Sequence, residues 1–349
     1  MDSVTPGTSR QPTLADIAAR AGTTVPTVSK VLNGRSDVSE ITRNKIMELV
    51  AQTGYRRRGT TPVARPSRDR RLIDLVISNV AGGWANQVLV GVESAAAAAG
   101  YDLVVTVARP DGTASVRDDW VARLLARSSP GVVLALVDTG IDRLATLQAA
   151  GVPVVLLDPV DPPPDSVASV GATNWSAGRD VAEHLLGLGH RRLAVLAGSS
   201  RQLYNRARVD GFASAVRLHR DDPASGGQRE PTVCHLERQH SAVEEAGRLL
   251  DDPQRPTAIF ACADYLALAV MQAATARDIA IPQQLSLVGF DDLPEAAWAG
   301  LTTVRQPIAE MGAAAMRLLL RLREADRRLP REELATSLII RDTTAPPAG

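Results

Sequence analysis

The sequence predicts an all-α N-terminal domain followed by an α/β body of two doubly wound parallel-sheet lobes. Apolar residues recur at helical spacing through residues 13–55. From residue 72 onward, short apolar runs alternate with Ala- and Leu-rich helical segments, a rhythm typical of parallel strands joined by crossover helices. The rhythm occurs twice, around a proline cluster at residues 159–164, so two lobes are expected rather than one large sheet.

The expected elements of the body follow this rhythm along the chain. Strands are expected at residues 72–78, 103–107, 131–137, 154–158, 193–197, 258–261 and 285–289. Helices are expected at residues 86–99, 175–188, 206–217 and 263–277. Open parallel sheets bind ligands beyond the carboxyl ends of their strands, and two facing lobes would place those ends around one cleft. A ligand site between the lobes is therefore expected.

Charge is balanced overall but is unevenly distributed. Residues 1–71 carry 13 Lys and Arg against 6 Asp and Glu, whereas the remaining residues carry 26 against 33. A basic N-terminal region on an acidic body points to a polyanionic partner at the N-terminus. Charge alone leaves a solvated basic segment as the alternative.

The composition argues against several other classes of protein. The two cysteines, Cys234 and Cys262, are far apart, which fits neither a disulfide framework nor a clustered metal site. The chain has no apolar signal segment at its start and no apolar run of roughly 18 residues, so a cytoplasmic protein with no membrane contact is expected. Nucleophile-elbow, phosphate-loop and zinc-protease motifs do not occur, so neither an enzyme nor a cofactor is expected.

Residues 13–22 predict a short helix that ends in a tight turn. Thr13 and Asp16 form a capping box in which Asp replaces the usual Glu or Gln. The apolar residues on its inner face are Leu14, Ile17, Ala18 and Ala21. Gly22 is expected to end the helix, because glycine readily takes the left-handed conformation of such a turn.

A second helix follows, and its outer face suits DNA. Thr24 can cap this helix, and Pro26 is tolerated in its first turn. Its inner residues are Val28, Val31 and Leu32, and its outward residues are Val25, Pro26, Ser29, Lys30 and Asn33. A helix, a glycine turn and a second helix with small, polar and cationic outer residues can enter a major groove.

Ser39 is expected to cap a third helix and so complete a helix-turn-helix domain over residues 13–55. The residues that can face phosphates are Thr42, Arg43, Asn44 and Lys45, and those that pack inward are Ile46, Leu49 and Val50. A three-helix bundle with no role in DNA binding is the alternative that periodicity and charge leave open.

These residues resemble the head of the lactose/galactose repressor family of bacterial transcriptional regulators. The resemblance covers residues 13–18, 21–22, 27–33, 38–39, 42–43 and 54–55 with fixed gaps. It implies a homodimer that binds a near-palindromic operator. It also implies base-reading candidates, namely Val25, Pro26 and Lys30, and candidates near the DNA backbone, namely Thr24, Thr27, Ser29, Asn33 and Thr42. Val25 and Pro26 offer a base only apolar contact, so Lys30 is expected to carry much of the hydrogen-bond readout.

The linker at residues 56–71 departs from the family's pattern. Arg57 and Arg58 stand where the family usually has Pro-Asn, and Ala64 stands where it has the Leu that wedges into the minor groove. Pro62 and Pro66 disfavour a regular helix there. The arginines are candidates for binding phosphates or a narrow minor groove, with a solvated charge run as the alternative.

The resemblance continues through nearly all of the body and implies the family's periplasmic-binding-protein-like effector domain. Its motifs lie at residues 91–93, 100–101, 151–154, 178–184, 189–192, 210–212, 289–292 and 301–307. In the family the chain crosses between the lobes three times. The implied first lobe is therefore about 72–168 and 306–335, and the second about 169–305 and 336–349.

Four polar residues carry over as contacts for a small-molecule effector, most simply a sugar: Asp158, Arg208, Asp291 and Gln306. Carboxylates accept hydrogen bonds from sugar hydroxyls, and Arg donates a planar pair. Trp84 and Trp175 are candidates for stacking on a sugar ring, with core packing as the alternative. Ala263 departs from the family, which often has Asn there, so the effector need not be a simple monosaccharide.

Together these features predict a sequence-specific DNA-binding repressor of sugar-metabolism genes, controlled by a small-molecule effector. A solute-binding protein of a transport system shares the body fold, but it would need a secretory signal and no DNA-binding head. An enzyme on a similar scaffold is a more distant alternative, which the fold alone does not exclude.

Overall fold

The computed structural model divides the chain into two compact units, Met1–Ser67 and Arg68–Gly349. It describes residues 13–32, 38–53, 72–108, 119–220, 230–236, 241–324 and 330–348. The expected tail at 1–12 and the linker at 56–71 lie outside these ranges, and so do three of the DNA-contact candidates, Asn33, Arg57 and Arg58.

The described part of the N-terminal unit contains α1 (Leu14–Ala21), α2 (Val25–Leu32) and α3 (Glu40–Thr53). The capping box is confirmed, because the Asp16 amide donates to Thr13 Oγ1 at 3.3 Å and the Thr13 amide donates to Asp16 Oδ2 at 2.7 Å. Gly22 ends α1 with φ 69°, as expected. The core of the unit consists of Ile17, Ala18, Ala21, Val28, Val31 and Ile46.

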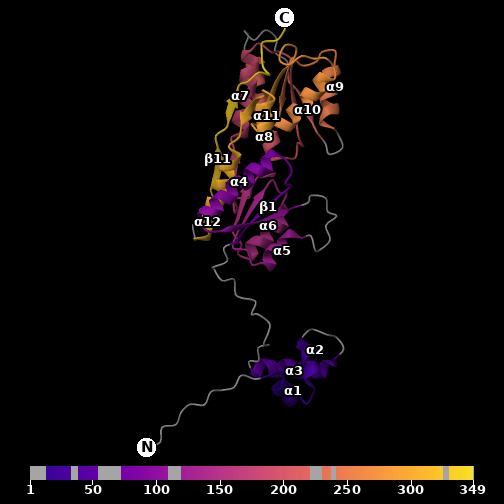
Figure 1. The fold of residues 1–349 in the computed structure, drawn as a ribbon, viewed down its shortest axis with the longest axis vertical. Helices are drawn as coiled ribbons and strands as arrows, with labels where there is room; N and C mark the ends of the chain where they lie inside the picture. Colours follow the sequence, from indigo (N-terminus) through magenta and orange to yellow (C-terminus); the bar gives the residue numbers. More distant parts are fainter. Residues whose placement is uncertain are drawn as a thin grey trace, which may run out of the picture. The chain divides into compact units, whose positions relative to one another are not determined.

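The first lobe of the body is built on a six-stranded parallel sheet with the order β11-β5-β4-β3-β1-β2. Its strands are β1 (Leu72–Ile77), β2 (Asp102–Val107), β3 (Val132–Ala135), β4 (Val154–Leu157), β5 (Ala168–Ala172) and β11 (Arg331–Leu334). Helices α4 (Gly83–Ala98) and α12 (Ile308–Arg323) pack on one face, where Leu75 points, and lie side by side (Figure 1). Helices α5 (Trp120–Ala126) and α6 (Gly140–Ala149) pack on the other face, where Val76 points.

The second lobe repeats this design with the strand order β12-β10-β9-β8-β6-β7. Its strands are β6 (Leu193–Ala197), β7 (Thr232–His235), β8 (Ala258–Ala261), β9 (Ser286–Asp291), β10 (Thr302–Arg305) and β12 (Ser337–Ile339), of which only β12 is antiparallel to its neighbour. Helices α7 (Asn174–Gly187) and α8 (Leu203–Arg220) cover one face. Helices α9 (Ala242–Asp251), α10 (Asp264–Thr275) and α11 (Pro294–Trp298) lie on the other (Figure 1).

The chain crosses between the two sheets three times: after β5, after β10 and between β11 and β12. The first crossing comes a few residues later than the expected boundary at 168/169, because residues 168–172 pair with β4 and β11 in the first sheet. Hydrogen bonds join the crossing after β5 directly to the crossing between β11 and β12. The Thr173 and Thr336 hydroxyls lie 2.9 Å apart, and the Thr336 amide donates to Thr173 Oγ1 at 3.0 Å.

Two glycines let α7 and α8 pack backbone against backbone. A Cβ atom on Gly178 would lie 2.0 Å from the Arg208 carbonyl oxygen, and one on Gly211 would lie 1.9 Å from the Trp175 carbonyl oxygen. A main-chain carbonyl within a helix has little freedom to move aside. The close contact therefore depends on the absence of a side chain at both positions.

We predict that Gly178→Ala lowers the stability of the body by about 1–3 kcal/mol or more, the usual cost of overpacking a close contact. The matched control is Gly187→Ala on the same helix, where an added Cβ meets nothing within 4 Å. This control should leave the melting temperature unchanged or raise it slightly, because alanine has the higher helix propensity. Thermal unfolding followed by circular dichroism tests both variants, and equal melting temperatures would contradict the close-contact argument.

Candidate functional site

The outer face of α2 presents the residues expected to meet DNA. Val25 is 40% exposed, Pro26 and Lys30 are also exposed, and Thr27 and Ser29 are half-buried. The Thr24 and Thr27 hydroxyls lie 2.9 Å apart, which orders the first turn of α2. At the start of α3, the half-buried Thr42 donates its amide to Ser39 Oγ at 3.3 Å, as expected for the cap. The predicted outward direction of Val25, Pro26 and Lys30 is thus present in the structure.

In the body, four polar candidates lie where the strands of both sheets end. Asp158 directly follows β4 of the first lobe, and Asp291 ends β9 of the second. Arg208 lies on α8, and Gln306 lies at the crossing between β10 and α12. All four side chains are buried, with exposed fractions of 3–8%.

Arg208 is the centre of this cluster. Its Nε donates to Asn174 Oδ1 at 2.8 Å, its Nη1 to the Cys262 carbonyl at 2.7 Å and its Nη2 to Gln306 Oε1 at 3.2 Å. The guanidinium carbon lies 3.5 Å from the centre of the Phe290 ring, within the range of a cation–π contact. The cation is therefore bonded to three neutral acceptors rather than to a carboxylate.

Gln306 joins the two lobes through this cluster. Its Oε1 accepts from Arg208 of the second lobe, while its Nε2 donates to Asp158 Oδ2 of the first lobe at 3.5 Å and to Met311 Sδ at 3.3 Å. The amide thereby connects the guanidinium to one of the two carboxylates. We call Asp158, Arg208, Asp291 and Gln306 the central polar cluster.

The two carboxylates retain unused capacity to accept hydrogen bonds. Burial raises the pKa of Asp158, against the opposing effects of Arg208 and of the Gln306 hydrogen bond. Burial also raises the pKa of Asp291 well above its ordinary value; Arg208 opposes this, while Asp264 and Asp158 reinforce it. Among the described residues, no side chain or amide donates to the Asp291 carboxylate. A ligand that supplies hydroxyl donors would meet this need.

The two tryptophan candidates lie apart from these contacts. Trp84, on α4, packs against the core of the first lobe, and Trp175, in the first turn of α7, is 44% exposed. Within the described residues, no hydrogen bond or ring contact links either indole to the central polar cluster. Their stacking role stays a prediction.

Three residues of the site escaped sequence reasoning. Asn174 orients Arg208, Phe290 lies against the guanidinium, and Tyr204 lies one turn before Arg208 with its ring centre 5.3 Å from the guanidinium carbon. Burial strongly raises the pKa of Tyr204 and keeps it a neutral hydrogen-bonding group. A signal existed for Phe290, which adjoins Asp291 in a recognised motif, and for Tyr204, which lies four residues before Arg208 on the same helix, whereas Asn174 reaches Arg208 only through the packing of α7 on α8.

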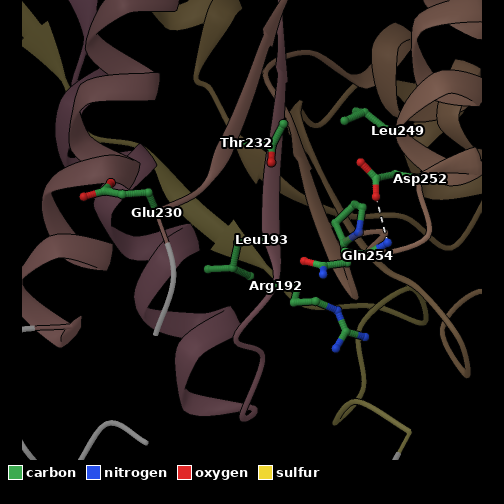
Figure 2. A pocket seen from close by; sticks show the side chains of 8 residues that line it. Arg192, Leu193, Glu230, Thr232, Leu249, Asp252 and Gln254 are labelled. Carbon is green, nitrogen blue, oxygen red and sulfur yellow. Dashed lines mark hydrogen bonds between the residues drawn. The ribbon is translucent and has the colours of Figure 1, made fainter. Parts of the chain in front are cut away.

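A separate surface pocket lies at the opposite end of the second sheet (Figure 2). Its lining includes Arg192, Thr232, Asp252 and Gln254, near the amino ends of β6 and β7. The Asp252 carboxylate accepts from the Gln254 amide at 2.7 Å and so caps its own loop. These side chains do not converge on one point in Figure 2, and none of the residues that line the pocket belongs to the central polar cluster.

Comparison with known proteins identifies both units. Residues 13–58 match the model of the bacterial regulatory proteins of the lacI family, and residues 182–344 match the periplasmic binding protein-like domain. The HTH-type transcriptional regulator DegA of Bacillus subtilis (strain 168) is 30% identical over 344 residues, which cover 96% of this chain and 98% of DegA. This chain belongs to the lacI family.

Solved structures of lacI-family proteins agree with this assignment. The transcriptional regulator CelR in complex with cellobiose is 27% identical with a TM-score of 0.69, covering 95% of this chain and 99% of CelR. The lac repressor dimer bound to operator and the anti-inducer ONPF is 26% identical with a TM-score of 0.67, covering 96% of this chain and all of the repressor chain.

Family membership decides between the classes of function that the sequence left open. The chain is a DNA-binding transcriptional regulator, neither a transport binding protein nor an enzyme, because the relatives that align with it over nearly their full length are helix-turn-helix transcriptional regulators. In the described part of the chain, no helix is long and apolar enough to span a membrane.

The raised pKa of Asp291 predicts a pH dependence of stability. A carboxyl whose pKa is higher in the folded state contributes stability at acid pH, and this contribution is lost as the pH rises through the folded-state pKa. Asp291→Asn removes that loss, so the melting temperature of the variant relative to wild type should increase as the pH is raised from about 5 to 8.

The control for this measurement is Asp251→Asn. The hydrogen bond from Arg277 lowers the pKa of Asp251, so this substitution should not gain stability relative to wild type as the pH rises. Differential scanning calorimetry at four pH values tests both variants. A pH-independent difference for Asp291→Asn would show that its carboxyl has an ordinary pKa in the folded protein.

Proposed function

We propose that this protein is a cytoplasmic repressor that binds its operator as a homodimer through α2 and changes operator affinity when a neutral sugar occupies the central polar cluster. The observation that carries the proposal is the position of Gln306. Its amide contacts Arg208 of the second lobe and Asp158 of the first, so a ligand inserted there acts on both lobes at once. A ligand can shift a conformational equilibrium only by contacting two states differently, and a site shared by two lobes allows this.

The chemistry of the cluster favours an uncharged polyol. Two buried carboxylates can accept hydroxyl donors, whereas each nitrogen of the Arg208 guanidinium already donates to a neutral acceptor of the protein. An anionic group would have to displace these contacts and lie beside two carboxylates. The CelR relative was solved in complex with cellobiose, which is an uncharged ligand of this kind.

The DNA-binding part of the proposal rests on the outer face of α2. Val25 and Pro26 can contact a thymine methyl, and Lys30 can donate to guanine. Thr24, Thr27 and Ser29 lie on or beside α2 and Thr42 lies in the first turn of α3, and their hydroxyls suit the DNA backbone, with Asn33, Arg57 and Arg58 as further candidates outside the described residues. The lac repressor relative was solved as a dimer on operator, which supports a dimer here.

We predict that Lys30→Ala lowers affinity for the operator roughly five- to hundredfold more than it lowers affinity for random DNA, the effect of losing one good base contact. The operator is first selected from a random duplex library with the full-length protein. Fluorescence anisotropy then compares this variant with Lys45→Ala, an exposed cation on α3 that should weaken both DNAs alike. Equal losses for both DNAs in Lys30→Ala would assign Lys30 to phosphate.

We predict that a neutral sugar raises the melting temperature and changes operator affinity, and that Asp291→Asn raises the required sugar concentration roughly ten- to hundredfold, the effect of losing one buried hydrogen-bond acceptor of the Asp291 carboxyl. The screen uses cellobiose, maltose and ribose, with glucose 6-phosphate as the anionic comparison. Operator affinity without sugar should not change in the variant. A response to the phosphate alone, or an unchanged midpoint in Asp291→Asn, would refute the proposed site.

A further inference from the structure

The turn that carries Asp291 has an unusual backbone. Asp291 has φ 115° and Asp292 has φ 57°, both in the region that side-chain-bearing residues rarely adopt. Two consecutive residues in this region persist only where surrounding contacts hold them. The contacts that hold this turn therefore determine where the Asp291 carboxylate points.

Asp292 is held by two arginines from different parts of the chain. Arg305, at the end of β10, donates its Nε to Asp292 Oδ2 at 2.8 Å, and Arg341, in the C-terminal segment, donates its Nη2 to Asp292 Oδ1 at 2.6 Å. The Asp292 side chain is only 7% exposed, and that of Arg341 is 19% exposed, so solvent screens this pair less than a surface ion pair. Both carboxylate oxygens of Asp292 are thus occupied.

Arg341 is itself fixed to the second lobe. Its Nη1 donates to the Leu301 carbonyl at 2.7 Å, and its amide donates to Thr302 Oγ1 at 2.9 Å. On the other side of the turn, the Leu293 amide donates to Asp264 Oδ2 at 2.8 Å. The turn is therefore fixed immediately after Asp291, while the Asp291 carboxylate receives no hydrogen bond from the described residues.

We propose that Arg341 is a positioning residue for the effector site: through Asp292 it holds the strained turn that directs the Asp291 carboxylate toward the ligand. The inference rests on the proposed function for its ligand and extends the site to the C-terminal segment, which contributes no residue to the central polar cluster. A ligand-dependent response is thereby coupled to residues near the end of the chain.

The first test needs no ligand. In Arg341→Gln the turn loses one of its two cationic contacts, so amide hydrogen exchange at Leu293 and at Gln306, whose amide donates to the Asp291 carbonyl at 3.4 Å, should become faster. Exchange at Val288, within β9, should not change. Unaltered exchange at Leu293 and Gln306 would show that Arg341 does not hold the turn.

The matched control is Thr343→Val, which disturbs the same C-terminal segment without touching Asp292. Thr343 Oγ1 donates to the Leu287 carbonyl at 2.7 Å and accepts from the Thr302 amide at 2.9 Å. This variant should lower the melting temperature. If it accelerates exchange at Leu293 as much as Arg341→Gln does, the segment acts through general stability, and the proposal is overturned.

The second test measures the response of the full-length protein to cellobiose, maltose and ribose. Arg341→Gln should raise the sugar midpoint for the change in operator affinity roughly two- to thirtyfold, the range for residues that act through a contacting network, and should leave sugar-free operator affinity unchanged. Asp292→Asn should do the same, and the double variant should cost no more than the larger single effect, because both act through one contact. Additive losses would overturn the proposal.

The two hypotheses fail in different ways. If wild type responds to none of the three sugars while the exchange results hold, the proposed sugar effector is wrong and the positioning of the turn by Arg341 stands. If wild type responds and Arg341→Gln responds at the same sugar concentration, Arg341 is not a positioning residue and the proposed function stands.

Discussion

The arrangement of the effector body depends on one buried cation. Arg208 is 3% exposed, and moving a guanidinium out of water is costly unless each of its nitrogens finds a partner. Those partners come from the start of α7, the end of β8 and the crossing after β10, so three separate segments must converge on α8. The close contact between α7 and α8 at Gly178 places the Arg208 backbone accurately enough for this convergence.

The connections of Gln306 to the two lobes are unequal. Its contact with Arg208 spans 3.2 Å, whereas its contact with Asp158 spans 3.5 Å, the long limit of a hydrogen bond. Gln306 is thus bound more weakly to the first lobe than to the second. A ligand that offers Asp158 a better donor can replace the weak contact while leaving the Arg208 arrangement intact.

Local chemistry explains how much of the fold could be predicted. The capping box at Thr13 and the turn at Gly22 depend on neighbouring residues, and the buried central strands are continuous apolar runs, so both were visible in the sequence. Strands β5, β7, β10, β11 and β12 were missed because, unlike the equally short β4, they are not continuous apolar runs and are defined by distant partners. The central polar cluster was predicted through family motifs, but the contact of Arg208 with Asn174 arises only from the packing of α7 on α8. Arg305 and Arg341 both form ion pairs with Asp292, but no local sequence pattern links either arginine to the turn at residue 292.

The interleaved order of the body constrains how it forms during synthesis. The core of the first lobe includes Met311, Met316 and Leu319 of α12, and its sheet is completed by β11, so most of the second lobe is translated before the first lobe has its full core. The second lobe in turn lacks β12 and the Thr343 contacts until the last residues emerge. The N-terminal unit has its own core and is translated first. A nascent chain can therefore carry a folded DNA-binding unit before either lobe of the body is complete, and termination before β11 would yield a DNA-binding unit attached to a body in which both lobes are incomplete.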